Sequence, residues 1–264
     1  MPAVNPARLK NQIDHMVSFI TKPDAFHREL QMVFEFYANR TLRMGDYISS
    51  QPLIPLYHLP DPVIRQVELS IRQHIQEEPL DGFAIADELW TDEFFEIRHL
   101  AGYTLGMIPL EDPEPVCRRL RTWLSPDLDQ ALTTDLLSRG THTLRLDFPL
   151  VWEQFIESYL SHIDPRMVGL GIQGLRVSLQ HRSDKLLPSV FRLISPLVIE
   201  VDQTLSKELE HLIKAMSVVS PTETAYYLKQ TLSISDSEGL TRLVKQCLPF
   251  FDDDLQIELR PSLL

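Results

Sequence analysis

Proline residues mark the starts of predicted helices throughout this sequence, and they constrain the fold more than any other feature. Five of them follow an Asp or Ser residue, in the pairs Asp61-Pro62, Asp112-Pro113, Ser125-Pro126, Asp164-Pro165 and Ser220-Pro221. An Asp or Ser side chain at the N-cap accepts hydrogen bonds from unpaired backbone N–H groups, and proline at the first helical position loses no hydrogen bond. Each pair therefore predicts the start of a helix.

The spacing of these pairs predicts a repeat. The three Asp-Pro pairs and Ser220-Pro221 begin 51, 52 and 56 residues apart. Further helical patterns lie between them, over residues 92–107, 125–137, 148–162, 185–201 and 206–218. Two-helix units that recur about every 40 to 50 residues are typical of HEAT and armadillo repeats. We therefore expect an all-α fold, a right-handed α-solenoid of about six HEAT-like helix pairs, in a single domain over residues 1–264.

The composition limits the classes of function. The 264 residues include 25 Lys and Arg against 37 Asp and Glu, a formal net charge of −12. This acidic balance disfavours a protein whose whole surface is basic and binds nucleic acid. Two cysteines, Cys117 and Cys247, are too few for a disulfide scaffold or a four-thiolate zinc site. The first residues lack the apolar core of a signal peptide, and no stretch is apolar enough to span a membrane. We expect a cytoplasmic protein without a membrane anchor.

The charge is unevenly distributed along the chain. Residues 118–192 contain ten basic and eight acidic residues, a net charge of +2, so the remaining residues carry −14. A locally basic middle can hold a phosphate backbone, whereas the alternative is a solvated helix surface with ordinary ion pairs, since the excess is small. The candidate nucleic-acid-binding residues are the arginines Arg118, Arg119, Arg121, Arg139, Arg145, Arg176 and Arg182.

Three glycines match a nucleotide-binding pattern without its context. Gly169, Gly171 and Gly174 have the dinucleotide-binding spacing, which requires a preceding strand. Asp164-Pro165 starts a helix there instead, so we interpret the glycines as points of close helix–helix approach. The nine histidines include no HExxH pair. We therefore predict no metal and no small-molecule cofactor.

Two groups of residues resemble the HEAT-like-repeat DNA alkylation repair family. The first group comprises Ala86–Trp90, Glu96, Arg98 and Ala101. The second, which is similar to the last repeats of that family, comprises Pro221–Leu228, Leu240–Arg242 and Lys245. The resemblance implies the fold expected from the helix spacing. It also implies a relation to glycosylases that release cationic alkylpurines from DNA.

The resemblance implies a particular chemistry. An Asp carboxylate stabilises the oxocarbenium-like charge, and aromatic residues hold the lesion by CH–π and cation–π contacts. The matching carboxylate here is Asp135, but Ala131 stands where the family has Trp. The segment 167–171, MVGLG, falls where the family has Trp-x-Arg-Arg. Trp123 and Trp152 lie nearby in the sequence, and we interpret them as core residues.

Two functions remain open from the sequence. The first is a non-catalytic HEAT-repeat binding module that presents a concave surface to a protein partner or, less favoured, to duplex DNA. The second is an alkylpurine DNA glycosylase with Asp135 as its catalytic carboxylate. The acidic charge and the missing aromatic residues favour the binding module. The locally basic middle and the resemblance favour the enzyme.

Overall fold

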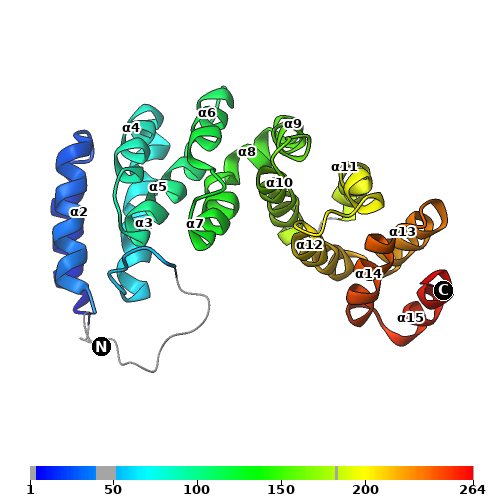
Figure 1. Ribbon diagram of the computed structural model, residues 1–264. Coiled ribbons are helices and arrows are strands. Elements are labelled where there is room, and N and C mark those ends of the chain that lie inside the picture. Colours follow the sequence, from blue (N-terminus) through cyan, green and yellow to red (C-terminus); the bar gives the residue numbers. More distant parts are fainter. Residues whose placement is uncertain (1–3, 40–51, 182–183, 264) are drawn as a thin grey trace. The chain divides into compact units, whose positions relative to one another are not determined.

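The computed structural model describes residues 4–39, 52–181 and 184–263, and all regular secondary structure in these ranges is helical (Figure 1). The contacts within the chain divide it into two compact units, Met1–Pro149 and Leu150–Leu264. The expected all-α fold is therefore confirmed.

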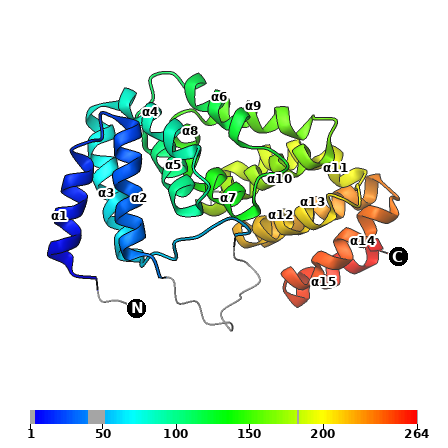
Figure 2. The same ribbon diagram turned by 60° about the vertical axis from the view of Figure 1, so that its left-hand side comes forward.

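The first unit consists of short and medium-length helices. They are α1 (Pro6–Val17), α2 (Pro23–Tyr37), α3 (Asp61–Glu77), α4 (Pro79–Trp90), α5 (Phe95–Met107), α6 (Glu114–Trp123), α7 (Gln130–Asp135), the π-helix η1 (Leu136–Gly140) and α8 (His142–Asp147). Figure 2 shows α1, α2 and α3 side by side, in agreement with the contacts among them.

Helices of the first unit contact their next-but-one neighbours, so that they pack in two rows. One row is formed by α1, α3, α5 and then α7 with η1, and the other by α2, α4 and α6. The core lies between the rows, where α3 buries Val63, Val67, Ile71 and Ile75 completely. These residues recur every four positions and form one apolar stripe, which a single helix cannot bury alone.

The second unit begins with α9 (Pro149–Leu160) and follows the same pattern. Its further elements are α10 (Pro165–Ser178), the 3-10 helices η2 (Leu179–His181) and η3 (Asp184–Leu186), α11 (Leu187–Ile199), α12 (Ser206–Val219), α13 (Pro221–Ile234), α14 (Glu238–Cys247), η4 (Leu248–Phe250), α15 (Asp253–Leu259) and η5 (Arg260–Leu263). Contacts join α10, α12 and α14 in one row and α11, α13 and α15 in another.

Four of the five predicted helix starts are confirmed, and one is wrong. Helix α10 begins at Pro165, and the Asp164 side chain accepts a hydrogen bond from the Arg166 N–H at 2.9 Å. The helices predicted at residues 61, 112 and 220 begin within two residues of these positions. The pair at 125–126 starts no helix, because Asp129 provides the N-cap instead and α7 begins at Gln130.

The glycines at helix crossings are explained by close approach. A Cβ atom on Gly174 would lie 2.3 Å from Cδ1 of Ile156 in α9, and one on Gly171 would lie 2.9 Å from the Leu160 side chain. The interpretation of these two residues as contact points is confirmed, whereas a Cβ atom on Gly169 would make only an ordinary contact, 3.9 Å from Leu205. The tightest crossing involves α5, where a Cβ atom on Gly106 would lie 1.8 Å from the Arg139 carbonyl oxygen.

This crossing gives a stability prediction with a matched control. Replacing Gly106 with Ala forces α5 away from the Arg139 backbone, and we expect the free energy of unfolding to fall by about 3 kcal/mol, as in overpacked cores. Gly102 lies one turn earlier, and its added Cβ would meet nothing closer than 3.6 Å. Gly102→Ala should therefore be neutral or stabilising by up to about 1 kcal/mol. Urea denaturation of the two variants measures both values, and equal stabilities would contradict the close approach.

Candidate functional site

A cluster of charged side chains surrounds His99 in the first unit. His99 lies on α5, and its Nδ1 is 2.9 Å from Oδ2 of Asp135 while its Nε2 is 3.0 Å from Oε1 of Glu68 on α3. Arg139 contacts the same two carboxylates, at 2.9 Å to Glu68 and 3.3 Å to Asp135. The structure therefore brings together two of the residues predicted from the sequence, Asp135 and Arg139, and adds Glu68 and His99 to them.

His99 carries a positive charge in this cluster. Burial alone would lower the pKa of His99, but the hydrogen bonds to Asp135 and Glu68 outweigh burial and raise the pKa to about 9. Both ring nitrogens face carboxylate oxygens, and only the imidazolium form donates from both nitrogens. The cluster thus contains two cations and two anions, and its net charge is zero at neutral pH.

The local backbone positions Asp135 and Arg139 for these contacts. Asp135 ends α7 and Arg139 lies in the π-helix that follows, four residues later. A π-helix is a wider turn that recurs at functional sites in proteins. Here the glycines Gly106 and Gly140 also let the backbones of α5 and η1 approach closely. The close crossing places the carboxylate of Asp135 beside His99.

The arrangement limits what Asp135 can do chemically. Its two oxygens accept from His99 and Arg139, and only 14% of its side chain is exposed. A carboxylate that stabilises a developing cation must present its charge to the substrate. The charge of Asp135 is instead neutralised by two groups of the same chain. Arg139 is the accessible member of the cluster, with 45% of its side chain exposed.

The pKa of His99 predicts how stability depends on pH. Because the pKa rises from 6.5 in the unfolded chain to about 9 in the folded protein, the stabilisation is complete below pH 6.5 and is lost as the pH approaches 9. We expect the free energy of unfolding to fall by about 3 kcal/mol at most over this range. Urea denaturation across the pH range measures it, with His99→Gln as the comparison.

The His99→Gln variant should lose less stability than the wild type over the same pH range. Parallel curves for the two proteins would contradict the assigned charge of His99. An NMR titration of the His99 ring in the wild type provides a second measurement that needs no variant. Its midpoint should lie near pH 9 rather than 6.5.

Several of the predicted nucleic-acid-binding arginines are occupied by contacts within the protein. Arg119 donates to both carboxylate oxygens of Asp87, at 2.6 and 2.7 Å. Arg121 pairs with Glu114 at 2.8 Å. Arg145 is largely buried and donates to backbone and hydroxyl oxygens of its own segment. These three arginine side chains therefore stabilise the first unit through contacts within the chain.

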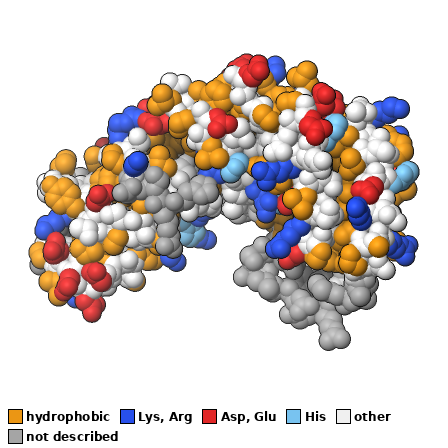
Figure 3. All heavy atoms as spheres, turned by 180° about the vertical axis from the view of Figure 1, so that it is seen from behind, with side chains coloured by type: hydrophobic (Ala, Val, Ile, Leu, Met, Phe, Trp, Pro, Cys, Tyr) orange, Lys and Arg blue, Asp and Glu red, His pale blue; other side chains and the backbone are white. Residues whose placement is uncertain are grey.

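The other predicted arginines lie in separate units or outside the described residues. Arg118 is exposed on α6 in the first unit, and Arg176 lies on α10 in the second unit. Arg182 lies outside the described residues. Figure 3 shows several Lys and Arg side chains close together near the middle of the view, and acidic, basic and apolar side chains interspersed elsewhere on this face.

The tryptophans of interest are core residues. Trp123 is 8% exposed and stacks on Trp90 with ring centroids 4.5 Å apart, which joins α4 to α6. Trp152 is 6% exposed, and its indole N–H donates to Ser178 Oγ at 2.8 Å. The interpretation of Trp123 and Trp152 as core residues is confirmed. Arg98 lies over the Trp90 ring at 5.7 Å.

Residues 52–60 form a non-helical segment, called here the strap. It is held by the buried carboxylate of Glu96, which accepts hydrogen bonds from the backbone N–H groups of Tyr57 at 3.0 Å and His58 at 2.8 Å. The backbone of His58 has a φ of 54°, in the left-handed region that is uncommon outside glycine. Two hydrogen bonds to one buried carboxylate fix this turn. The hydrogen-bond donors of Glu96 therefore lie in the strap, where the sequence shows no helical periodicity.

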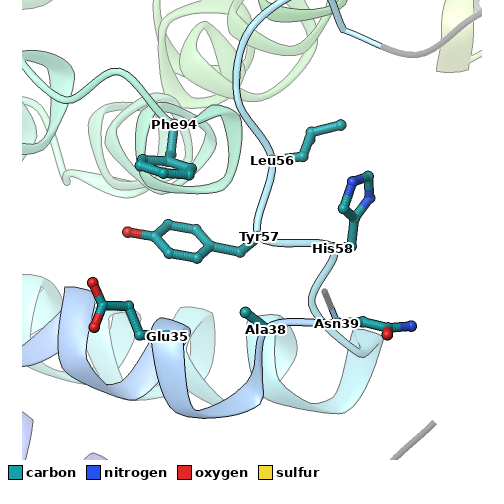
Figure 4. A pocket seen from close by; sticks show the side chains of 7 residues that line it. All are labelled: Glu35, Ala38, Asn39, Leu56, Tyr57, His58 and Phe94. Atoms are coloured by element: carbon teal, nitrogen blue, oxygen red, sulfur yellow. The ribbon is translucent and has the colours of Figure 1, made fainter. Parts of the chain in front are cut away.

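The strap forms one wall of a cavity of about 320 Å³ (Figure 4). The lining residues are Glu35, Ala38, Asn39, Leu56, Tyr57, His58 and Phe94. The rings of Tyr57 and Phe94 stack with centroids 4.1 Å apart. Burial, followed by the repulsion of nearby carboxylates, raises the pKa of Tyr57 to about 12. The surroundings of this cavity are therefore acidic.

A second cavity, of about 470 Å³, lies on the second unit between α10 and α12. Its lining residues are Arg176, Leu179, Gln180, His211, Lys214, Ala215 and Val218. Arg176 is the only one of them that the sequence analysis selected. His211 and Lys214 were missed because they lie outside the segment over which the charge was summed.

The described residues hold no group of three or more His, Cys, Asp or Glu side chains placed to bind a metal ion. Among the same residues, no helix combines the length and the apolar character needed to cross a membrane.

Comparisons with protein-family models, with curated proteins and with solved structures found no match for this chain.

Proposed function

We propose that this chain is a non-catalytic binding module, a right-handed α-solenoid of HEAT-like repeats that is related to the DNA alkylation repair proteins. It presents a concave surface to a protein partner. The contacts between next-but-one helices in each unit support the repeat, because stacked helix pairs bury the apolar stripes that each pair leaves open. The residues that resemble the family lie at such positions, since Trp90 joins α4 to α6 through Trp123.

The state of Asp135 is the observation that carries the proposal. Its carboxylate is engaged by His99 and Arg139, and the aromatic residue expected four positions earlier is Ala131. A glycosylase built on this carboxylate would have to break both contacts before it could stabilise a cationic sugar. Unpairing charged groups that are largely buried costs several kcal/mol, which works against catalysis.

The charge of the protein favours a protein partner over DNA. A net charge of −12 repels a polyanion, and Arg119, Arg121 and Arg139 are already paired with carboxylates. The basic side chains Arg176, His211 and Lys214 around the second cavity are the observation that favours DNA as a second candidate. DNA binding through phosphate contacts would weaken steeply with salt.

An excision assay tests the proposal against the alternative enzyme. We expect no release of methylated purines from duplex DNA, and we expect Asp135→Asn to lower the free energy of unfolding by about 3 kcal/mol because His99 loses a charged partner. The assay measures released base, and urea denaturation measures stability. Arg118→Gln is the control for stability, since it removes an exposed charge of the same chain.

The alternative function, an alkylpurine DNA glycosylase that uses Asp135, predicts the reverse. Wild-type protein would release methylated purines, and Asp135→Asn would abolish the release while the variant remained folded. That result would overturn the binding-module proposal. If the protein bound duplex DNA without releasing methylated purines, the chain would still be a binding module, but its partner would be DNA and not a protein.

A further inference from the structure

We propose that the cavity walled by Tyr57 and Phe94 binds an arginine side chain of the partner protein. This inference rests on the proposed binding function and names the chemistry that the module recognises. Figure 4 shows the Phe94 ring stacked on the Tyr57 ring, with the Glu35 carboxylate on the side of the Tyr57 hydroxyl and Asn39 and His58 on the other side.

Aromatic side chains make the cavity suited to a flat cation. The rings of Tyr57 and Phe94 stack on each other at an angle of 22° with centroids 4.1 Å apart, so a cation does not fit between them and would stack on a ring face that points away from this contact. A guanidinium group is planar, weakly hydrated and attracted to aromatic rings, and it stacks on them more readily than an ammonium group does. The remaining lining atoms of Leu56 and Ala38 can pack against the methylene groups of an arginine stem.

The electrostatics of the cavity select a cation. Glu35 lines it, is exposed, and has no ion pair or side-chain hydrogen bond among the described residues. The carboxylates of Asp92, Glu93 and Glu96 lie near enough to contribute to the raised pKa of the Tyr57 phenol. No Lys or Arg is among the described residues that line the cavity. A bound guanidinium would meet the Glu35 carboxylate as its charge partner, and a carboxylate can accept two N–H···O hydrogen bonds from one guanidinium group.

Hydrogen bonds hold the strap wall of the cavity in place in the protein without a partner. Glu96 holds the Tyr57 and His58 N–H groups, and the Asn39 N–H donates to the Tyr57 carbonyl oxygen at 3.0 Å. Phe95 N–H in turn donates to the Pro55 carbonyl oxygen at 2.9 Å. A site whose walls are held by hydrogen bonds loses little conformational entropy on binding.

The size of the cavity and the charge of the chain identify the occupant. About 320 Å³ is at the lower limit of ligand cavities, which commonly measure about 300–1,000 Å³, and it suits one side chain rather than a folded segment. The net charge of −12 attracts a basic polypeptide and accelerates its encounter with the module. Both facts favour an arginine presented by a partner protein.

Peptide binding to the full chain tests the proposal. A short glycine-rich peptide that carries arginine is compared with peptides of the same length that carry lysine or citrulline, the uncharged isostere of arginine. We expect the arginine peptide to bind at least about tenfold more tightly than the citrulline peptide, by fluorescence anisotropy, with lysine between them. N-acetyl-arginine amide should bind more weakly than the peptide, because the proposed source is a polypeptide.

A pair of charge-matched variants locates the site. Glu35→Gln should weaken binding of the arginine peptide about tenfold. Glu77→Gln removes another exposed charge, on α3 outside the cavity, and should leave binding unchanged within about twofold. Both positions are exposed, so folding is preserved. Equal binding of arginine and citrulline peptides, equal effects of the two variants, or no measurable binding would each overturn the proposal. These outcomes are independent of the excision assay, which tests the proposed function alone.

Discussion

The imidazolium of His99, held between Glu68 and Asp135, is the interaction on which the first unit depends. It joins α3, α5 and α7 at one point, and a charged group this deeply buried is tolerated only when its partners are in place. His27 has the same arrangement in the other row, between Glu88 and Asp92, which ties α2 to the end of α4. Each row thus uses one histidine between two carboxylates to connect successive helix pairs.

This interaction has a direct consequence for chemistry. A carboxylate that serves as a structural partner of an imidazolium and a guanidinium has its negative charge already balanced within the protein. Asp135 has the residue type and the position in the sequence that a glycosylase would need, but its contacts are those of a group that stabilises the fold. Glu35, at the cavity beside the strap, is by contrast a carboxylate near aromatic rings that has no ion pair among the described residues. Within the first unit, Asp135 therefore stabilises the fold, whereas Glu35 is the carboxylate assigned to the proposed binding of a partner.

The sequence predicted the parts of the fold that are encoded locally. Proline and its preceding residue act within one helical turn, so the start of α10 at Pro165 could be predicted from two residues. The start of α7 was mispredicted, because Asp129 competes with Ser125 for the role of N-cap and the pattern of prolines does not reveal which residue prevails. The cavity could not be predicted, since Tyr57, Phe94 and Glu35 share no period, and a buried Glu96 connects the strap to α5 only in three dimensions.

The ion pairs of the basic middle agree with the alternative that the sequence analysis gave for it, a solvated helix surface with ordinary ion pairs. Residues 118–192 carry a net charge of +2, yet Arg119, Arg121, Arg139, Arg166 and Arg192 all form ion pairs with carboxylates. Exposed pairs of this kind cancel each other's field beyond a few ångströms, more strongly in salt. Meanwhile Glu35, which lines the aromatic cavity, and Glu93, which lies near Tyr57, have no ion pairs among the described residues. Because unpaired charges attract an oppositely charged group, the proposed recognition of a partner would depend on the acidic side chains, and the basic middle would contribute less than its residue count indicates.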